Sequence, residues 1–268
     1  GIETYDENNL KNLMTQKSEY RGNRLYKNNK GKFVDVTDEA RIINTMIGYG
    51  LGVVVSDLNN DSWPDVYVGN DFSEKDFLYI NNHDGTFRET SLQSFKHISN
   101  FSMGNDIADI NNDGLLDIMA VDMMAEDNYS QKTSMSGMDP DRFYKYTNLG
   151  LHYQYMYNTL QLNNGNNTFS EVAYHSGVAK TDWSWAPLFA DVDNDGNRDL
   201  LITNGFPRDI TDKDFVNYRA YVGNIASTRQ LLDSIPIVKI PNYAYKHKGN
   251  LAFEDAGEAW GLNQPSFS

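Results

Sequence analysis

The sequence predicts an all-β protein, a β-propeller built from four-stranded blades, and three observations carry this prediction. An acidic nine-residue motif, D-x-[DN]-x-D-[GS]-x-x-D, occurs three times and begins at Asp57, Asp109 and Asp191. A second motif, with the character of a β-hairpin, alternates with the acidic motif along the chain. The spacing between the two motifs is nearly constant, and such regular self-similarity is typical of repeat proteins.

The acidic motif is expected to join the first two strands of each unit. Its three copies read DLNNDSWPD, DINNDGLLD and DVDNDGNRD, and a short apolar run follows each of them. An aromatic residue stands eight positions before the first aspartate, and a small residue stands five positions before it. These flanking residues are Tyr49, Phe101 and Trp183, and Gly52, Gly104 and Ala186. Short β-prone runs on both sides of a polar turn predict two strands with the acidic loop between them.

The hairpin motif is expected to supply the other two strands. Each copy is a β-prone run, a polar Asn/Gly turn and a phenylalanine that opens another run. The copies occupy residues 23–33, 76–87, 158–169 and 242–253. Asn and Gly tolerate the backbone conformations of tight turns, so this pattern predicts a hairpin. From Phe87 to Asp109, and again from Phe169 to Asp191, the spacing is 22 residues.

Together the two motifs give four strands per unit. In the most regular unit we expect strands at about 51–56, 65–69, 77–80 and 86–90. Four-stranded units repeated around an axis are the blades of a propeller; a β-solenoid is the alternative, although its repeats are usually shorter and more even. We expect residues 1–268 to form a single propeller domain, or a fragment of one, with about three whole blades and partial end blades. The expected repeat units are about 23–50, 51–104, 105–186 and 187–268.

Composition bounds the functions that the chain can have. Asp and Glu number 37 against 23 Lys and Arg, which gives a net charge of −14 over 268 residues. Nucleic-acid binding draws on clustered Lys and Arg, so this balance argues against a nucleic-acid partner and favours cations. The chain has no cysteine, which excludes disulfides and thiolate chemistry. No run approaches the ~18 apolar residues of a membrane span, so we expect no direct membrane insertion.

The crowded carboxylates of the acidic motif repel one another unless a cation lies between them. A hard cation such as Ca²⁺ takes about six to eight oxygen ligands, and the side chains at positions 1, 3 and 5 of a tight loop converge on one point. A backbone carbonyl at position 7 and an aspartate at position 9 complete the cage, and glycine at position 6 permits the sharp turn. The alternative is a solvated acidic turn, but three copies with matched flanks favour ion-binding loops.

The alternation of D-x-[DN]-x-D-G-x-x-D with LYxNN…GTF resembles the FG-GAP/VCBS repeat family, which is related to the propeller of integrin α subunits. The segment at 158–196 is similar to bacterial VCBS-repeat proteins, many of which end in an ASPIC/UnbV domain. The resemblance implies a complete propeller of roughly seven or eight blades, Ca²⁺ in the loops, and an exported or cell-surface protein that binds other molecules. By the same resemblance, its location is the bacterial outer surface or the periplasm.

The resemblance also implies about three Ca²⁺ ions, one in each acidic loop. The implied ligands are Asp57, Asn59, Asp61, the Trp63 carbonyl and Asp65; Asp109, Asn111, Asp113, the Leu115 carbonyl and Asp117; and Asp191, Asp193, Asp195, the Asn197 carbonyl and Asp199. Ser62 replaces the glycine of the first loop, so the occupancy of that loop is open. Asp193 adds a charge to the third loop, which we therefore expect to bind most tightly. Dissociation constants on the order of 10⁻⁴–10⁻³ M are typical of extracellular modules, and such sites fill where calcium is abundant.

Two units carry an insertion of about 30 residues between their second and third strands, at about 123–157 and 206–240. Successive turns of an up-and-down blade alternate faces, so both insertions are expected on the face opposite the acidic loops, where long loops on a rigid scaffold usually carry binding. The first insertion is rich in Met and Tyr, and we expect it to cover the propeller face and form a small satellite core. The second predicts one or two amphipathic helices within 212–235, and we expect their apolar side to pack on the propeller.

These features predict a non-enzymatic binding or adhesion module, with calcium as a structural ion and a protein or glycan ligand on the face opposite the calcium loops. The alternative is a polysaccharide hydrolase or lyase, whose site in the inserted loops would need convergent carboxylates or a carboxylate with His or Tyr. The insertions offer Asp139, Asp141 and His152 for this role. The histidines of the chain show no metal-ligand spacing. We expect Trp183 and Trp185 to be a strand pair rather than a sugar platform.

Overall fold

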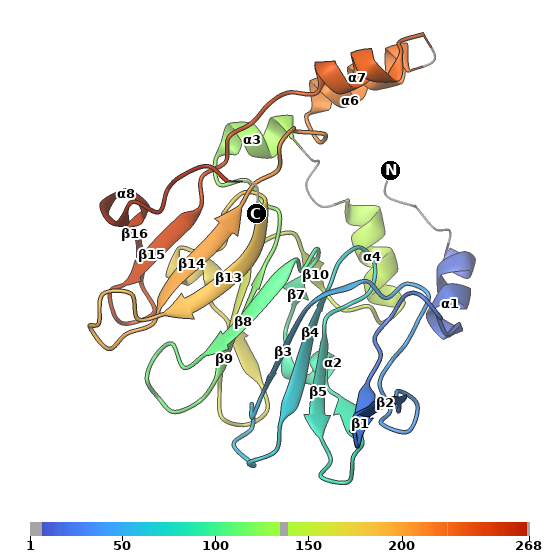
Figure 1. Ribbon diagram of the computed structural model, residues 1–268, viewed down its shortest axis with the longest axis vertical. Coiled ribbons are helices and arrows are strands. Elements are labelled where there is room, and N and C mark those ends of the chain that lie inside the picture. Colours follow the sequence, from blue (N-terminus) through green and yellow to red (C-terminus); the bar gives the residue numbers. More distant parts are fainter. Residues whose placement is uncertain (1–6, 135–138, 224, 267–268) are drawn as a thin grey trace.

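The computed structural model describes residues 7–134, 139–223 and 225–266, and three four-stranded antiparallel sheets form its framework (Figure 1). The first contains β3 (Gly50–Ser56), β4 (Asp65–Asn70), β5 (Phe77–Asn81) and β6 (Phe87–Glu89). The second contains β8 (Gly104–Ala108), β9 (Asp117–Val121), β11 (Thr159–Asn163) and β12 (Phe169–Glu171). The third contains β13 (Ser184–Ala190), β14 (Asp199–Asn204), β15 (Tyr243–His247) and β16 (Phe253–Asp255). Each sheet is an up-and-down blade, which confirms the predicted fold class, and the strands of the first blade match the predicted ones to within one residue.

The first strands of the three blades lie side by side, with β3 next to β8 and β8 next to β13. The apolar core lies between the blades, in two main clusters. The cluster between the first and second blades includes Tyr67, Leu78, Phe95, Ile118 and Phe169. The cluster between the second and third blades includes Met119, Leu160, Phe189, Leu200 and Ile202. The second blade therefore buries one face of its sheet against the first blade and the other face against the third.

Close packing of these first strands explains the small residue that recurs five positions before each acidic loop. A Cβ atom on Gly104 would lie 2.3 Å from the backbone oxygen of Trp185 in β13. A Cβ atom on Gly52 would lie 2.6 Å from the side-chain nitrogen of Asn105 in β8. The obstacle at Gly104 is backbone, so this position requires glycine, whereas the obstacle at Gly52 is the end of a side chain, so this position only favours a small residue.

A polar clamp closes each blade at the end opposite its acidic loop, where the second strand leaves the sheet and the third returns. In the first blade the backbone N–H of Asn70 donates to Asp76 Oδ1 at 2.8 Å. The other blades repeat the bond, from Asp122 to Asn158 at 2.7 Å and from Asn204 to Asn242 at 2.8 Å. The paired residues are 6, 36 and 38 positions apart in the chain. In the second and third blades, the clamp therefore joins the two residues between which the insertion begins and ends.

The first insertion forms α3 (Asn128–Thr133), α4 (Pro140–Asn148) and β10 (Gln154–Tyr155), and β10 pairs in parallel with β7 (Ile98–Ser99). Asp127 and Asp139 cap α3 and α4, because their carboxylates accept backbone N–H groups of the first turn. Helix α4 packs beside α1 (Glu7–Thr15) in a small cluster of its own. That cluster contains the buried side chains of Leu10, Ile47, Tyr146 and Leu151. A satellite core is therefore present, but of the Met and Tyr residues of the insertion only Tyr146 belongs to it, and Tyr129 and Tyr144 are exposed.

The second insertion forms α6 (Lys213–Val222) and α7 (Thr228–Ser234), as the helical pattern predicts. The expectation that their apolar side packs on the propeller is wrong. Only Phe215 is buried within α6 and no residue is buried within α7, while Tyr221 is 85 % exposed. The apolar residues of α6 are spread around the helix rather than gathered in one stripe, so no single face is suited to burial. Both helices accordingly lie beyond the ends of the blades (Figure 1).

The remaining elements are short. A hairpin of β1 (Tyr26–Asn29) and β2 (Lys32–Asp35) precedes the first blade. One-turn helices follow the fourth strand of each blade, namely α2 (Ser91–Ser94), α5 (Ala173–Ser176) and α8 (Gly257–Trp260). Within the described ranges, no helix has the length and apolar character needed to cross a membrane.

Candidate metal centres

The first aspartate of each acidic loop holds the turn together by accepting two backbone N–H groups from within the loop. In the first loop, Asp61 N–H donates to Asp57 Oδ1 at 3.0 Å and Ser62 N–H donates to Asp57 Oδ2 at 2.7 Å. The second and third loops repeat both bonds at distances of 2.9 to 3.1 Å, with Asp109 accepting from Asp113 and Gly114, and Asp191 accepting from Asp195 and Gly196. The three loops therefore share one backbone conformation.

Positive φ angles at positions 4 and 6 produce the sharp turn of this conformation. The three asparagines at position 4 have φ values of 59° to 60°; they are Asn60, Asn112 and Asn194. At position 6, Gly114 and Gly196 have φ values of +84° and +88°, whereas Ser62 has +68°. Left-handed backbone disfavours every residue with a Cβ atom, Asn less than most. The glycine predicted at position 6 is thus explained, and Ser62 holds a strained conformation in the first loop.

The aspartate at position 9 is fully buried and ties the loop to the third strand of its blade. Asp65 Oδ2 accepts from Leu58 N–H at 3.0 Å and Oδ1 accepts from Asn81 N–H at 2.9 Å. The equivalent pairs of bonds join Asp117 to Ile110 and Asn163, and Asp199 to Val192 and His247. Burial raises the pKa of Asp65 above its usual value and raises the pKa of Asp117 to about 6. Both carboxylate oxygens at position 9 already accept backbone N–H groups of the blade. Their role as metal ligands stays a prediction.

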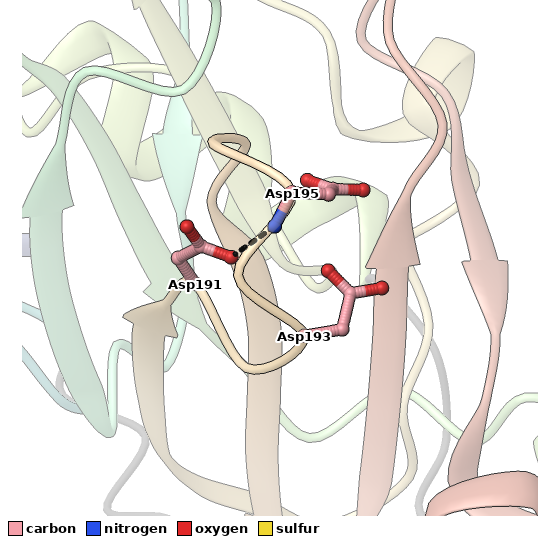
Figure 2. Close-up of side chains that lie close together, drawn as sticks. All are labelled: Asp191, Asp193 and Asp195. Atoms are coloured by element: carbon pink, nitrogen blue, oxygen red, sulfur yellow. Dashed lines mark hydrogen bonds between the residues drawn. The ribbon is translucent and has the colours of Figure 1, made fainter.

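The third loop brings three carboxylates around one turn, as Figure 2 shows. One oxygen from each of Asp191, Asp193 and Asp195 lies within 4.8 Å of the others. In the part of the chain that the structure describes, this is the one group of three or more His, Asp or Glu side chains with metal-binding geometry. Three carboxylate oxygens suit a hard cation such as Ca²⁺, so the residues present fit the predicted ion.

Lys246 of β15 also reaches the third loop. Its Nζ contacts Asp193 Oδ2 and lies 3.3 Å from Asp195 Oδ2. These contacts raise the pKa of Lys246, with the hydrogen bond to Asp193 as the largest cause. An ion bound by the third loop would have to displace this ammonium group. Lys246 is 53 positions from Asp193 in the chain, so the charges within the acidic motif alone do not predict this contact.

The first two loops have an asparagine at position 3 and bring fewer carboxylates together. Asn59 Nδ2 donates to Asp61 Oδ2 at 2.9 Å, and Asn111 Nδ2 donates to Asp113 Oδ2 at 2.9 Å. An amide contributes one neutral oxygen in place of a charged carboxylate, so these loops hold less negative charge than the third. Of the implied ligands, Asp191, Asp193 and Asp195 therefore form a cluster of three carboxylates. The implied ligands of the other two loops form no such cluster among the described residues.

The first loop has a partner that sequence reasoning missed. His83 Nε2 lies 2.9 Å from Asp61 Oδ2, and the His83 ring stacks on Trp63 with centroids 5.0 Å apart. The hydrogen bond from His83 is the largest of the causes that lower the pKa of Asp61. His83 lies in the Asn/Gly turn between β5 and β6. In an up-and-down blade this turn lies at the same end as the acidic loop, and this placement could have predicted the contact.

Neighbouring loops are joined to each other through position 4. Asn60 Nδ2 donates to the carbonyl of Gly114 at 3.3 Å, and Asn112 Nδ2 donates to the carbonyl of Gly196 at 3.4 Å. Position 7 also serves its own loop, since the backbone N–H groups of Trp63, Leu115 and Asn197 donate to the aspartate at position 5 at 2.8 to 2.9 Å. The three loops therefore form a connected row along one face.

The residues considered for catalysis do not form an open cleft. Asp139 and His152 line the same cavity, but its volume is only about 10 Å³, which is room for one water and not for a sugar ring. Asp139 caps α4, and His152 Nδ1 accepts the backbone N–H of Tyr153 at 2.7 Å. Asp141 is exposed on α4 and does not line this cavity.

Trp183 and Trp185 have different surroundings. Trp185 lies in β13, packs against the apolar cluster between the second and third blades, and donates from Nε1 to the carbonyl of Gly205 at 2.7 Å. Trp183 precedes the strand and packs against Phe206, with ring centroids 4.6 Å apart.

Comparison with known families agrees with this architecture. The FG-GAP-like repeat model matches residues 11–68, 57–120 and 149–202, which together span more than half of the chain and contain all three acidic loops. A search of curated proteins found no match. On the strength of the repeated match, the chain belongs to the FG-GAP-like repeat family.

Proposed function

We propose that this protein is a calcium-stabilised propeller module that binds another macromolecule and has no catalytic activity of its own. The observation that carries the proposal is the row of three acidic loops with one shared hydrogen-bond pattern, one of which gathers three carboxylates within 4.8 Å. FG-GAP repeats suggest an integrin-like propeller module and often bind calcium, which supports the same assignment. The ion would neutralise carboxylates that otherwise repel each other, and so would stabilise the blades.

The proposed sites are the three loops, with about three ions in all. Each site takes the side chains at positions 1, 3, 5 and 9 and the carbonyl at position 7, as the family resemblance implies. Loops of this charge and exposure are expected to bind Ca²⁺ with Kd values on the order of 10⁻⁴–10⁻³ M. Sites this weak fill outside the cell, and FG-GAP repeats are typical of extracellular proteins. We therefore propose an extracellular or cell-surface location.

The proposed binding face lies at the opposite ends of the strands, where both insertions project (Figure 1). Loops carried on a rigid scaffold are the usual place for recognition. A protein or glycan ligand would contact the two insertions there. Release of reducing ends from polysaccharides by the intact protein would contradict the non-catalytic part of the proposal.

Metal removal tests the proposal directly. We expect elemental analysis of protein dialysed in Ca²⁺ to give about three ions per chain, and chelation to lower the melting temperature. Ca²⁺ should restore the melting temperature better than Mg²⁺, because Mg²⁺ demands a stricter octahedral cage and releases its waters reluctantly. Unchanged melting after chelation, with no Ca²⁺ retained, would sink the proposal.

Two variants sharpen this test at the third loop. Asp193→Asn should weaken one Ca²⁺ site, whereas Asp233→Asn, which neutralises an exposed carboxylate on α7, should leave all sites unchanged. Lys246→Met removes the ammonium that contacts Asp193 and Asp195, and should tighten Ca²⁺ binding at this loop because the ion no longer competes with it. Calorimetric titration of the three variants with Ca²⁺ measures each effect.

A further inference from the structure

A cavity of about 540 Å³ opens where both insertions meet the segment that precedes β13. Its walls come from the start of the first insertion and α3, from residues 206–211 and 238–241 of the second insertion, and from Asp182 and Trp183. The volume falls within the range of about 300–1,000 Å³ that is typical of small-ligand pockets. Neither the acidic loops nor the family assignment accounts for this pocket.

One part of the pocket wall is aromatic and sulfur-rich. The rings of Trp183 and Phe206 lie 4.6 Å apart with their planes inclined by 53°. Three methionines, Met123, Met124 and Met156, line the same cavity. Aromatic faces carry negative electrostatic potential, and thioethers are soft and polarizable, so this wall favours a weakly hydrated positive charge over a strongly hydrated group.

The other part of the wall carries carboxylates that have no cationic partner. Asp182 Oδ2 accepts from Tyr243 Oη at 2.7 Å, and the same hydroxyl lies 3.1 Å from Glu126 Oε2. Asp182 Oδ1 also accepts from Glu126 N–H at 3.3 Å, so both donors to Asp182 are neutral. Burial is the largest cause that raises the pKa of Tyr243, followed by its hydrogen bond to Asp182, so the hydroxyl is a neutral donor and brings no positive charge to the two acids.

Asp209 adds a carboxylate from the second insertion to the pocket and is only 7 % exposed. Its oxygens accept from Thr211 N–H at 2.8 Å, from Thr211 Oγ1 at 2.6 Å and from Ser134 Oγ at 3.3 Å, and all three donors are neutral. Across residues 7–134, 139–223 and 225–266, neither Asp182 nor Asp209 forms an ion pair with Lys, Arg or His. The lining lysines, Lys132 and Lys239, are exposed. Pocket carboxylates without a cationic partner attract a cation from solution.

We infer that this pocket binds a compact organic cation, such as a quaternary or protonated amine, between the Trp183–Phe206 rings and the carboxylates of Asp182 and Asp209. The inference rests on the proposed function, since it names the class of ligand group that the binding face recognises. The cation can be a free small molecule or the amine group of a larger ligand; in either case the recognised chemistry is the same. Neutral sugars would satisfy the carboxylate oxygens with hydroxyl groups but would leave the negative charge unbalanced.

The experiment is a calorimetric titration of the full chain in Ca²⁺ at constant ionic strength. The probes are choline chloride, tetramethylammonium chloride and 3,3-dimethyl-1-butanol, which has nearly the shape of choline without its charge. We expect both cations to bind at one site, and the neutral alcohol to bind at least tenfold more weakly. Equal binding of the alcohol and choline, no binding of either cation, or tighter binding of a neutral oligosaccharide would overturn the inference.

Variants locate the site. Asp182→Asn and Phe206→Leu should each weaken choline binding about tenfold, because the first removes a charge and the second removes an aromatic face. Asp233→Asn, an exposed acid on the second insertion, is the matched control and should leave choline binding unchanged. Equal weakening in all three variants would show general electrostatic attraction and overturn the assigned site.

Circular dichroism and the count of bound Ca²⁺ for each variant keep the two proposals separate. If choline fails to bind to a chain that still holds about three Ca²⁺ ions, only the cation inference is overturned. If the chain binds no Ca²⁺ and its melting is unaffected by chelation, the proposed function itself is overturned.

Discussion

Ser62 has a φ of +68° at the position where the other two acidic loops have glycine. A left-handed conformation costs an L-residue about 1–2 kcal/mol, part of which is offset because glycine loses more chain entropy on folding. We expect Ser62→Gly to raise the free energy of unfolding by a net ~0.5–1 kcal/mol, with the bond from residue 62 N–H to Asp57 retained. Urea denaturation in chelator measures the change. The reverse substitution, Gly114→Ser in the second loop, should lower stability, and a stabilising result there would refute the explanation.

Asp76 is a second residue with a measurable consequence. It is fully buried and accepts from Tyr67 Oη, Asn70 N–H and Ser102 Oγ, and burial raises its pKa to about 6. Because this pKa lies above that of an aspartate in the unfolded chain, the folded state binds more protons between about pH 4 and pH 6. The contribution of Asp76 to the free energy of unfolding is therefore largest below about pH 4 and decreases as the pH rises to about 6.

We expect Asp76→Asn to flatten this pH dependence. The first blade would then use asparagine in its clamp, as the other two blades do with Asn158 and Asn242. Urea denaturation at pH 4.5, 5.5 and 7 should show that the variant loses less stability with rising pH than the unmodified chain, by on the order of 1 kcal/mol. Some dependence should remain, since burial also raises the pKa of Asp71 to about 6. A slope identical to that of the Asp233→Asn control would contradict the assignment to Asp76.

At the scale of the elements, the contact between first strands sets a strict size limit. An added Cβ at Gly104 would meet backbone atoms of β13, which cannot move without moving the strand, whereas one at Gly52 would meet the end of the Asn105 side chain. We expect Gly104→Ala to cost about 2–3 kcal/mol and Gly52→Ala about 1 kcal/mol, within the usual range for overpacking. Thermal melting of both variants tests the order. A larger loss at Gly52 would show that the side chain of Asn105 is the more rigid obstacle.

Sequence patterns predicted these elements well wherever one motif fixed both ends of a strand. The strands around Asp57–Asp65 and the turn before Phe87 lie where expected, because turn residues and apolar runs act locally. The one-turn helices after each fourth strand were not predicted, since four residues are too few to show a helical period. The position of α6 and α7 was also missed, because propensity shows where a helix forms and not what it packs against.

The candidate site shows the same division. The repeated motif identified the loop positions, and the structure gives all three loops one hydrogen-bond pattern. Lys246 and His83 come from other strands and turns of the blade, so only the folded chain places them beside the acidic side chains. The pocket proposed to bind a cation joins several separate segments of the chain, such as those of Met123, Asp182 and Pro241, and no local pattern marks it.

At the scale of the whole molecule, the clamps separate the blades from the segments inserted in them. We expect replacement of residues 205–241 by the short connection of the first blade, residues 71–75, to leave a folded chain whose melting still responds to Ca²⁺. The bond between Asn204 N–H and Asn242 Oδ1 would still close the third blade. Circular dichroism melting and size-exclusion chromatography check the outcome, and choline binding should be lost with the pocket wall.

The control for this exchange carries Asn242→Leu in addition, which removes the acceptor of the clamp. We expect the control to melt at a lower temperature than the exchange alone, because the hydrogen bond that closes the third blade is lost. Equal melting of the two chains would show that the clamp does not define the limit of the blade.

The bonds from Asn60 to the Gly114 carbonyl and from Asn112 to the Gly196 carbonyl have a consequence for how the acidic face loads. An ion that rigidifies one acidic loop also fixes the carbonyl to which the asparagine of the neighbouring loop donates. The neighbouring loop then loses less conformational entropy when it binds its own ion. If the loops bind calcium as proposed, we expect uptake along the row to be cooperative, so that the face becomes rigid over a narrower range of calcium concentration than three independent loops would show.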